Sequence, residues 1–463
     1  MKKLLLLFSI PFLLHSCFVA KDYERPEIQE LDEDLFRSDN IPQDSLNMAD
    51  IPWNEVFTDP ILKNYIAEGL ENNIDIRRAI QQMIMAEAYV KQGKAGYFPT
   101  LNVGANVNHQ ILSKNSQFGS FFDGSITQYD VTGNLSWEAD IWGKIRSNER
   151  AFQASYLQSA AAHKAVQTRL IANIATTYYQ LLSLDAQKTI TEETIANRER
   201  SLETTKALKE AGNVTEVGVK QTEAQLYTAQ ALLIDVNNQI RLAENSLSIL
   251  LGEGPQVIER GNLEDQEINT PLKTGVPTQL LRNRPDILAA EYNLVNAFEL
   301  TNLARSNFYP SLSLSAGGGF QSLELDELFN ANSLFANLAG SLMQPVLNGR
   351  RIRTQFEVAE AQQEDALLNF KQAILNAGKE VSDALYNYEA SNEKIKILND
   401  QYNAYADASE YSEELLNNGL ANYLEVLTAR ENALNSQLSL INTEFSKLQA
   451  MVDLYRALGG GWQ

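Results

Sequence analysis

Four short segments of the chain alternate apolar and polar residues with a period of two. In 128–138 every second residue is apolar or glycine, and the residues between them are wholly polar. The segments 101–108, 311–320 and 333–342 alternate in a similar way. This pattern predicts strands with one apolar and one polar face. Each run has about ten residues, which is the length that crosses a bilayer as a tilted strand.

Two much longer stretches are typical of helices. Residues 144–211 contain neither Gly nor Pro, and at 1.5 Å per residue a helix of this length measures about 100 Å. The pair Gly212-Asn213 ends it, and 219–251 is again free of Gly and Pro. In the second half, 350–418 lacks Pro and contains a single glycine, Gly378, Gly419 ends this stretch, and 420–458 resumes it. We therefore predict two long antiparallel helical hairpins that turn at the two glycines. Their small, sparse apolar residues favour a coiled-coil wall over a thick core, and a soluble coiled-coil rod is the alternative.

The chain carries one unit twice. The segment Tyr97-Phe98-Pro99-Thr100-Leu101 recurs as Phe308-Tyr309-Pro310-Ser311-Leu312, and residues 212–219 align with 419–426. A unit of about 200 residues is too long for a solenoid repeat. The repetition predicts a pseudo-symmetric architecture in which each half reads helix, strand, strand, long helix, long helix.

Four membrane-length strands cannot close a barrel, and lipid does not tolerate an open sheet edge. Transmembrane barrels begin at about eight strands. We therefore expect the barrel to be shared between chains. Two chains would give a barrel filled by side chains, and three would leave room for a channel.

The N-terminus has the layout of a secretory signal. A basic start, Met1-Lys2-Lys3, precedes the apolar run 4–14, and Ser16 and the lone Cys17 follow. This arrangement resembles a bacterial lipoprotein signal, in which residues 1–16 are removed and Cys17 is acylated. Phe18 after the cysteine fits sorting to the outer membrane. A plain signal peptide with an incidental cysteine is the alternative.

Composition excludes several function classes. The chain has 38 Lys and Arg against 59 Asp and Glu, a net charge of −21, and this argues against a nucleic-acid partner. A single cysteine permits no intrachain disulfide, and three scattered histidines offer no Cys/His metal site. The glycines 317–319 lie in a strand pattern, whereas a phosphate-binding loop opens a helix. We expect no catalysis, no metal and no cofactor apart from the lipid on Cys17.

The chain resembles the TolC-like outer-membrane efflux factor family, in the lipoprotein branch that serves resistance–nodulation–division pumps. The most specific matches are Arg284-Pro285-Asp286-Ile287 and Ala457-Leu458-Gly459-Gly460-Gly461-Trp462. Further matches span nearly the whole mature chain: Asp59-Pro60, 74–79, Phe98-Pro99, 140–146, 284–291, 309–312 and 454–462. The resemblance implies a mixed membrane α+β fold. Its parts are a homotrimeric twelve-stranded outer-membrane β-barrel, a twelve-helix periplasmic α-barrel and an equatorial helical belt.

The same resemblance implies partners and a location. The partners are an inner-membrane proton-driven transporter and a periplasmic adaptor protein, and the location is the outer membrane of a Gram-negative bacterium. The helix tips that would meet the adaptor fall at Gly212, Asn213, Gly419 and Leu420.

The family closes the periplasmic end of its tunnel with inward-coiled tips lined by acids. Counting from Gly419 places the family's aspartate ring at Glu425, which predicts three carboxylates around one axis and a narrow, cation-selective resting pore. A solvated helix face is the alternative for this residue. The family's second acid falls at Thr428 and the matching acid of the first half at Gly218, so both are absent here.

These observations predict a passive exit duct for small molecules or ions. The alternative is a non-conducting periplasmic coiled-coil scaffold or adhesin, which has no need of four strands of membrane length. We expect the following division of the chain: signal peptide 1–16; lipidated segment 17–59; helix 60–98; strand pair 99–140; helical hairpin 141–252; equatorial linker 253–277; helix 278–309; strand pair 310–346; and helical hairpin with C-terminus 347–463.

Overall fold

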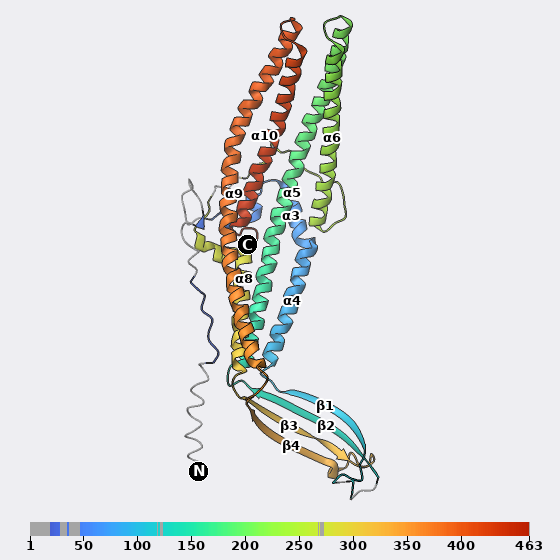
Figure 1. Ribbon diagram of the computed structural model, residues 1–463, viewed down its shortest axis with the longest axis vertical. Coiled ribbons are helices and arrows are strands. Elements are labelled where there is room, and N and C mark those ends of the chain that lie inside the picture. The colour runs from blue at the N-terminus through green and yellow to red at the C-terminus, as the bar shows by residue number, and fades with distance from the viewer. Residues whose placement is uncertain are drawn as a thin grey trace. The chain divides into compact units, whose positions relative to one another are not determined.

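The computed structural model describes residues 19–27, 35–36, 47–117, 119–120, 124–266, 268 and 273–462 of the 463-residue chain. The predicted signal peptide 1–16 and Cys17 lie outside the described residues. The chain divides into two compact units. One combines Met1–Glu27, Met83–Ser159 and Ala290–Phe370 and contains the strands, and the other combines Ile28–Gln82, Ala160–Ala289 and Lys371–Gln463 and contains the turns of the helical hairpins (Figure 1).

The first half of the chain holds η3 (Met48–Asp50), α2 (Trp53–Val56), α3 (Pro60–Asn72), α4 (Ile74–Ala95), β1 (Thr100–Ile111), β2 (Ser125–Ala139), α5 (Lys144–Glu210) and α6 (Glu216–Leu251). The second half holds η4 (Pro277–Gln279), α7 (Leu280–Asn283), α8 (Pro285–Ser306), β3 (Ser311–Ser322), η5 (Ala331–Ser333), β4 (Leu334–Met343), α9 (Arg351–Asn417) and α10 (Tyr423–Ala457). The order α4-β1-β2-α5-α6 is thus followed by α8-β3-β4-α9-α10.

The strands lie where the alternation predicts them. They form one antiparallel sheet in the order β1-β2-β3-β4, so β1 and β4 each have one edge without a partner strand in the described chain. The fourth strand begins one residue later than predicted, because Ser333 belongs to η5, whose N-cap Asn330 accepts a bond from the Asn332 amide.

The register aligns the apolar positions of all four strands on one face. Residues opposite each other in an antiparallel pair share a face. Leu101 pairs with Leu135, Leu135 with Ala316, and Ala316 with Leu338, and the rows beside this one are also built from apolar residues and glycine. The side chains of Val103 and Leu338 are 74% and 83% exposed, so this apolar face is not covered within the chain. An uncovered apolar face of this extent marks a contact with lipid or with protein.

The four long helices also match the prediction. The helices α5 and α9 have 67 residues each, and α6 and α10 have 36 and 35. The predicted helix 60–98, in contrast, contains two helices. Asn73 separates them, because its side-chain oxygen accepts bonds from the amides of Asp75 and Ile76 and so caps α4.

The hairpin-containing unit has a core in the middle of α5. Here Ile171, Ile174, Tyr178, Leu181 and Leu182 are buried at helical spacing. The hydroxyl of Tyr178 donates to Asp59 at 2.6 Å, and Asp59 also caps α3 through the Ile61 amide at 2.7 Å. Because Pro60 occupies the first position of α3, the Asp59-Pro60 motif is a helix start anchored to the core.

The two most specific sequence motifs meet in this unit. Arg284 bonds Asp286 within its own motif and the Ala457 carbonyl of the C-terminal motif at 3.0 Å. The indole of Trp462 donates to the Asn283 carbonyl at 2.8 Å. Gly459 has φ of 94° and lies against the Asn283 carbonyl, where a side chain would clash. The two motifs therefore fix residues 457–462 to the start of α8.

The first described residues dock on α8 in the strand-containing unit. Arg25 forms a two-bond ion pair with Glu291, at 2.6 and 2.7 Å. The backbone of Lys21 exchanges two hydrogen bonds with the side chain of Asn302, and Val19 is buried. The segment 19–25 thus runs antiparallel to α8, and its start lies near the end of α8 that leads into β3.

Among the described residues, no helix combines the length and apolar character needed to cross a membrane.

Candidate functional site at the hairpin tips

Both hairpins turn through the same backbone geometry. Gly212 and Gly419 have φ of 81° and 73°, the left-handed region that glycine adopts without strain. After α5 the amide of Asn213 bonds the Leu208 carbonyl, and after α9 the amide of Leu420 bonds the Leu415 carbonyl, both at 2.9 Å. Each glycine amide also bonds the carbonyl three residues earlier. These are the two bonds of the Schellman motif, so the sequence prediction of turns at both glycines is confirmed.

The tip residues are exposed. Leu420 is 75% exposed, Val217 65% and Leu424 55%, and Asn213 is also exposed. Apart from the glycine itself and its two chain neighbours, no described residue has an atom within 4 Å of the Cβ position of either turn glycine. The tips are therefore free to contact a partner, and contact with an adaptor protein stays a prediction.

Glu425 is the third residue of α10, and its side chain is exposed. Its amide donates to the Asn422 side-chain oxygen at 3.2 Å, and its carboxylate accepts from the Asn422 side-chain nitrogen at 3.2 Å. This reciprocal pair resembles a capping box. A negative side chain is also favoured in the first turn of a helix. Glu425 thus has a local role in starting α10, and its place in a gate stays a prediction.

The two positions at which the resemblance implies further acids carry Thr428 and Gly218, and each has its own local contacts. The hydroxyl of Thr428 donates to the Leu424 carbonyl of its own helix at 2.9 Å. A Cβ at Gly218 would lie 2.7 Å from a methyl group of Val214, so this glycine allows Val214 to pack onto the start of α6. At the turn between α5 and α6, Glu216 is an acid close to Gly218. The ion pair of Glu216 with Lys209 lowers the pKa of the Glu216 carboxyl.

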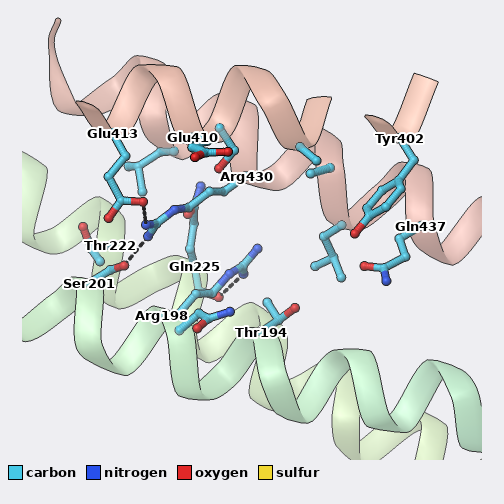
Figure 2. Close-up of a pocket in the computed structure, with 16 residues that line it drawn as sticks. Thr194, Arg198, Ser201, Thr222, Gln225, Tyr402, Glu410, Glu413, Arg430 and Gln437 are labelled. Carbon is cyan, nitrogen blue, oxygen red and sulfur yellow. Dashed lines mark hydrogen bonds and ion pairs between the residues drawn. The ribbon is translucent and has the colours of Figure 1, made fainter. Parts of the chain in front are cut away.

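Two arginines connect the hairpins just inside the tips (Figure 2). Arg198 of α5 donates to the Gln225 carbonyl of α6. Arg198 also pairs with Glu431 of α10 at 2.5 Å. Arg430 of α10 donates to the Ser201 hydroxyl of α5 and pairs with Glu413 of α9 at 2.6 Å. We call Arg198, Arg430, Glu413 and Glu431 the arginine cluster.

A pocket of about 430 Å³ adjoins the arginine cluster. Arg198 is only 7% exposed, so its charge depends on Glu431 for compensation. A further bond, from the Thr222 hydroxyl to the Tyr423 hydroxyl at 3.0 Å, joins α6 to the start of α10. These bonds hold the two hairpins together near their tips. Moving the hairpins apart requires the free energy needed to break them.

Sequence reasoning did not identify the arginine cluster, although a signal for Arg198 exists. The buried residues Leu184, Thr191, Arg198 and Thr205 recur at every seventh position of α5. A seven-residue period marks the seam between packed helices, and a polar residue in the seam fixes pairing. Its partner Glu431 lies 233 residues away in sequence, so the pairing itself needed the structure.

The described residues of the tips form no metal centre. No group of three or more His, Cys, Asp or Glu side chains within the described ranges is arranged to hold an ion. The chemistry available at the site is therefore electrostatic: carboxylates at the tips, and a set of ion pairs between the hairpins.

Comparison with known proteins agrees with this architecture. The sequence profile of the outer membrane efflux protein family matches residues 65–253 and 276–460. The cation efflux system protein CusC of Escherichia coli is 28% identical, over 99% of both chains. The toluene efflux pump outer membrane protein TtgF of Pseudomonas putida is 29% identical, over 100% of this chain and 98% of its own.

A solved structure of CusC superposes with a TM-score of 0.84 at 27% identity, and covers 96% of this chain and 100% of its own. The profile match spans well over half of the chain. The chain therefore belongs to the outer membrane efflux protein family, which places it among channel proteins of the outer membrane and not among enzymes.

Proposed function

We propose that this chain is the outer-membrane exit duct of a tripartite efflux system in a Gram-negative bacterium, and that it works as a homotrimer. The sheet supports this most directly. One face is apolar across all four strands, the other is largely polar, and the outer edges of β1 and β4 are unpaired. Lipid offers no hydrogen-bond partner to such edges. Three chains would close a twelve-stranded barrel with a polar, water-filled interior.

The helices support the same assembly. Four long helices per chain would give a periplasmic α-barrel of twelve helices, with the segment around 253–277 in an equatorial belt. The helix α6 exposes an apolar stripe at intervals of seven or eight residues: Tyr227, Ile234, Leu242 and Ile249. The helix α9 exposes Leu375, Tyr386 and Ile397 at intervals of eleven. Stripes of this period are what neighbouring helices of a coiled-coil wall cover.

In this proposal the duct is passive. An inner-membrane transporter of the resistance–nodulation–division class supplies the energy, and a periplasmic adaptor contacts the tips at Gly212, Asn213, Gly419 and Leu420. The relatives are named for different cargoes, cations and toluene, which fits a system in which the pump selects the cargo. The resting tips form the gate, where three Glu425 carboxylates would surround one axis and favour cations. Opening requires the bonds of the arginine cluster to rearrange.

The proposal includes a lipid on Cys17. The docking of residues 19–25 on α8 supports it, because the ion pair of Arg25 and the burial of Val19 hold the chain just after Cys17 close to the start of β3. An acyl group on Cys17 would then lie beside the membrane end of the strands. More than one acyl chain makes such an anchor stable.

The deciding experiment is the state of the mature protein in detergent and in planar bilayers. The proposal expects a heat-modifiable trimer that forms ion-conducting pores. A monomer or dimer that never conducts would instead support a periplasmic scaffold or adhesin built on the same coiled coils.

A further inference from the structure

The polar face of the sheet contains one row made almost entirely of carboxamides. The register pairs Asn102 with Asn134, Asn134 with Gly317, and Gly317 with Asn337. One position from each of the four adjacent strands β1–β4 therefore lies in the row (Figure 1). We call these four positions the carboxamide row. Three of them carry the same side chain, and the exception has no side chain at all.

The glycine in this row is required by its neighbours. A Cβ at Gly317 would lie 2.5 Å from the Oδ1 atom of Asn337 and 3.0 Å from the Oδ1 atom of Asn134. The two side-chain oxygens thus reach over Gly317 from both sides. The next glycine, Gly318, faces the opposite side of the sheet, where a Cβ would meet only the Phe335 carbonyl at 3.3 Å and more distant atoms. Gly317 therefore leaves space for the side chains of Asn134 and Asn337, whereas no side chain lies as close to the Cβ position of Gly318.

The oxygens over Gly317 are available to a ligand. The side-chain nitrogen of Asn134 donates to the Thr132 hydroxyl at 3.4 Å, which directs the nitrogen away from Gly317. Within the described chain, neither Oδ1 atom receives a hydrogen bond. Two converging carbonyl oxygens with no donor form a site for N–H groups or for a cation.

The residues around these oxygens favour a cationic ligand that also has an apolar organic group. The four strands contain no Lys or Arg, and their acids, Asp130 and Glu138, both lie on the polar face of β2. Each is four residues from Asn134, or about 13 Å along the strand. Phe335 is the aromatic exception on this face, and it precedes Asn337 by two residues in β4. An aromatic ring attracts an ammonium group over its face.

We propose that the carboxamide row, together with Phe335, is a transit site for organic ammonium cations. The ammonium donates N–H bonds to the oxygens of Asn134 and Asn337 over Gly317, and its organic part lies along Phe335. Asp130 raises the local cation concentration, whereas the charge of Glu138 is compensated by its ion pair with Lys144 at 2.9 Å. This inference rests on the proposed function in one respect, since it takes the polar face to be the inner surface of the channel.

The test uses benzylammonium, with benzenesulfonate as a control of opposite charge. Each compound is added to planar bilayers on the side of the loops that connect β1 to β2 and β3 to β4. Benzylammonium should reduce the current through the wild-type protein, and benzenesulfonate should not. Asn337→Ala and Gly317→Ala should each raise the half-blocking concentration about fivefold, the effect of one lost hydrogen bond. Phe335→Leu should raise it about threefold. Gly318→Ala adds the same methyl group to the other face and should leave the block unchanged.

A second measurement separates this inference from the proposed function. Ligand-observed NMR of benzylammonium with the purified protein in detergent measures binding without requiring conduction. If the protein binds benzylammonium, Asn337→Ala weakens this binding and the protein never conducts, the transit site is supported and the proposed exit duct is rejected. Normal conduction with equal block and equal binding in wild type, Asn337→Ala and Gly317→Ala would retain the duct and overturn the transit site.

Discussion

At the residue scale, Glu425 carries two separable properties. Its carboxylate accepts a bond from Asn422 and helps to start α10, and its negative charge would face the axis of the proposed gate. A neutral glutamine retains an acceptor for the Asn422 side chain and loses only the charge. The two properties can therefore be tested independently by one isosteric substitution.

We expect Glu425→Gln to reduce cation selectivity and block by multivalent cations while the assembly stays intact, because a ring of three carboxylates is replaced by a ring of amides. Single-channel recordings with asymmetric KCl measure the first effect, and added trivalent cations measure the second. Glu414→Gln is the matched control, since Glu414 is also an exposed acid near the turn. Equal selectivity and block in Glu425→Gln and wild type would assign this residue to helix capping alone.

At the residue scale, local features were predictable from the sequence, and contacts between distant residues were not. The turn glycines were predictable, because a glycine that ends a long run without Gly or Pro is a strong helix stop. The reciprocal bonds between Asn422 and Glu425 were equally local, and the spacing of three was available as a signal. The pairing of Arg198 with Glu431 was not predictable, because an ion pair across 233 residues depends on how the two hairpins pack.

At the element scale, the sheet makes a sharp prediction about its two faces. Leu338 lies on the exposed apolar face, and Asn106 lies on the polar face, where it donates to Asp130 at 3.0 Å. Leu338→Arg should destabilise the membrane-inserted protein by about 2–4 kcal/mol if Leu338 lies near the bilayer midplane, whereas Asn106→Arg should cost little. Denaturant titration in lipid vesicles, followed by heat modifiability on gels, measures both.

The opposite ranking in that experiment would mean that the register is displaced by one residue, since such a shift exchanges the two faces of every strand. The strand positions followed from the alternation of single residues. The row of Asn102, Asn134, Gly317 and Asn337 did not, because it requires the register of three strand pairs at once.

In the helices, the arginine cluster likewise joins residues that are far apart in sequence. Arg198→Met leaves Glu431 without its nearly buried partner, and we expect a loss of about 1–3 kcal/mol, less than for a fully buried pair because Glu431 is partly exposed. The double variant Arg198→Met with Glu431→Leu should recover part of this loss, because both charges are gone. Hydrogen exchange of the α5 and α10 amides near the tips reports the local stability.

In the same variants we expect the resting conductance to rise for Arg198→Met, since weaker bonds between the hairpins favour parted tips. Equal exchange rates and equal conductance in all variants would mean that the arginine cluster contributes nothing to holding the hairpins together.

At the scale of the whole molecule, the anchor predicted at Cys17 can be tested without reference to transport. Intact mass of the mature protein should show cleavage before Cys17 and added acyl mass. Cys17→Ala should lack the acyl mass and still insert through its strands, because the apolar face of the sheet is unchanged. A mature wild-type protein with a free Cys17 thiol would contradict the anchor, whatever its conductance.

The remaining whole-molecule question is assembly, where the exposed stripe of α6 allows a direct test. Ile234 is 70% exposed within one chain, so its side chain contributes little to the fold of that chain. If α6 packs against a neighbouring chain, Ile234→Asp buries an unpaired charge in the interface and should shift trimers to monomers. Asn237→Asp adds the same charge at another exposed position of α6 and should leave trimers intact. Native mass spectrometry and circular dichroism distinguish lost assembly from lost folding. Trimers that persist in Ile234→Asp would place the subunit contact on another face of the helices and leave the α6 stripe to a different partner.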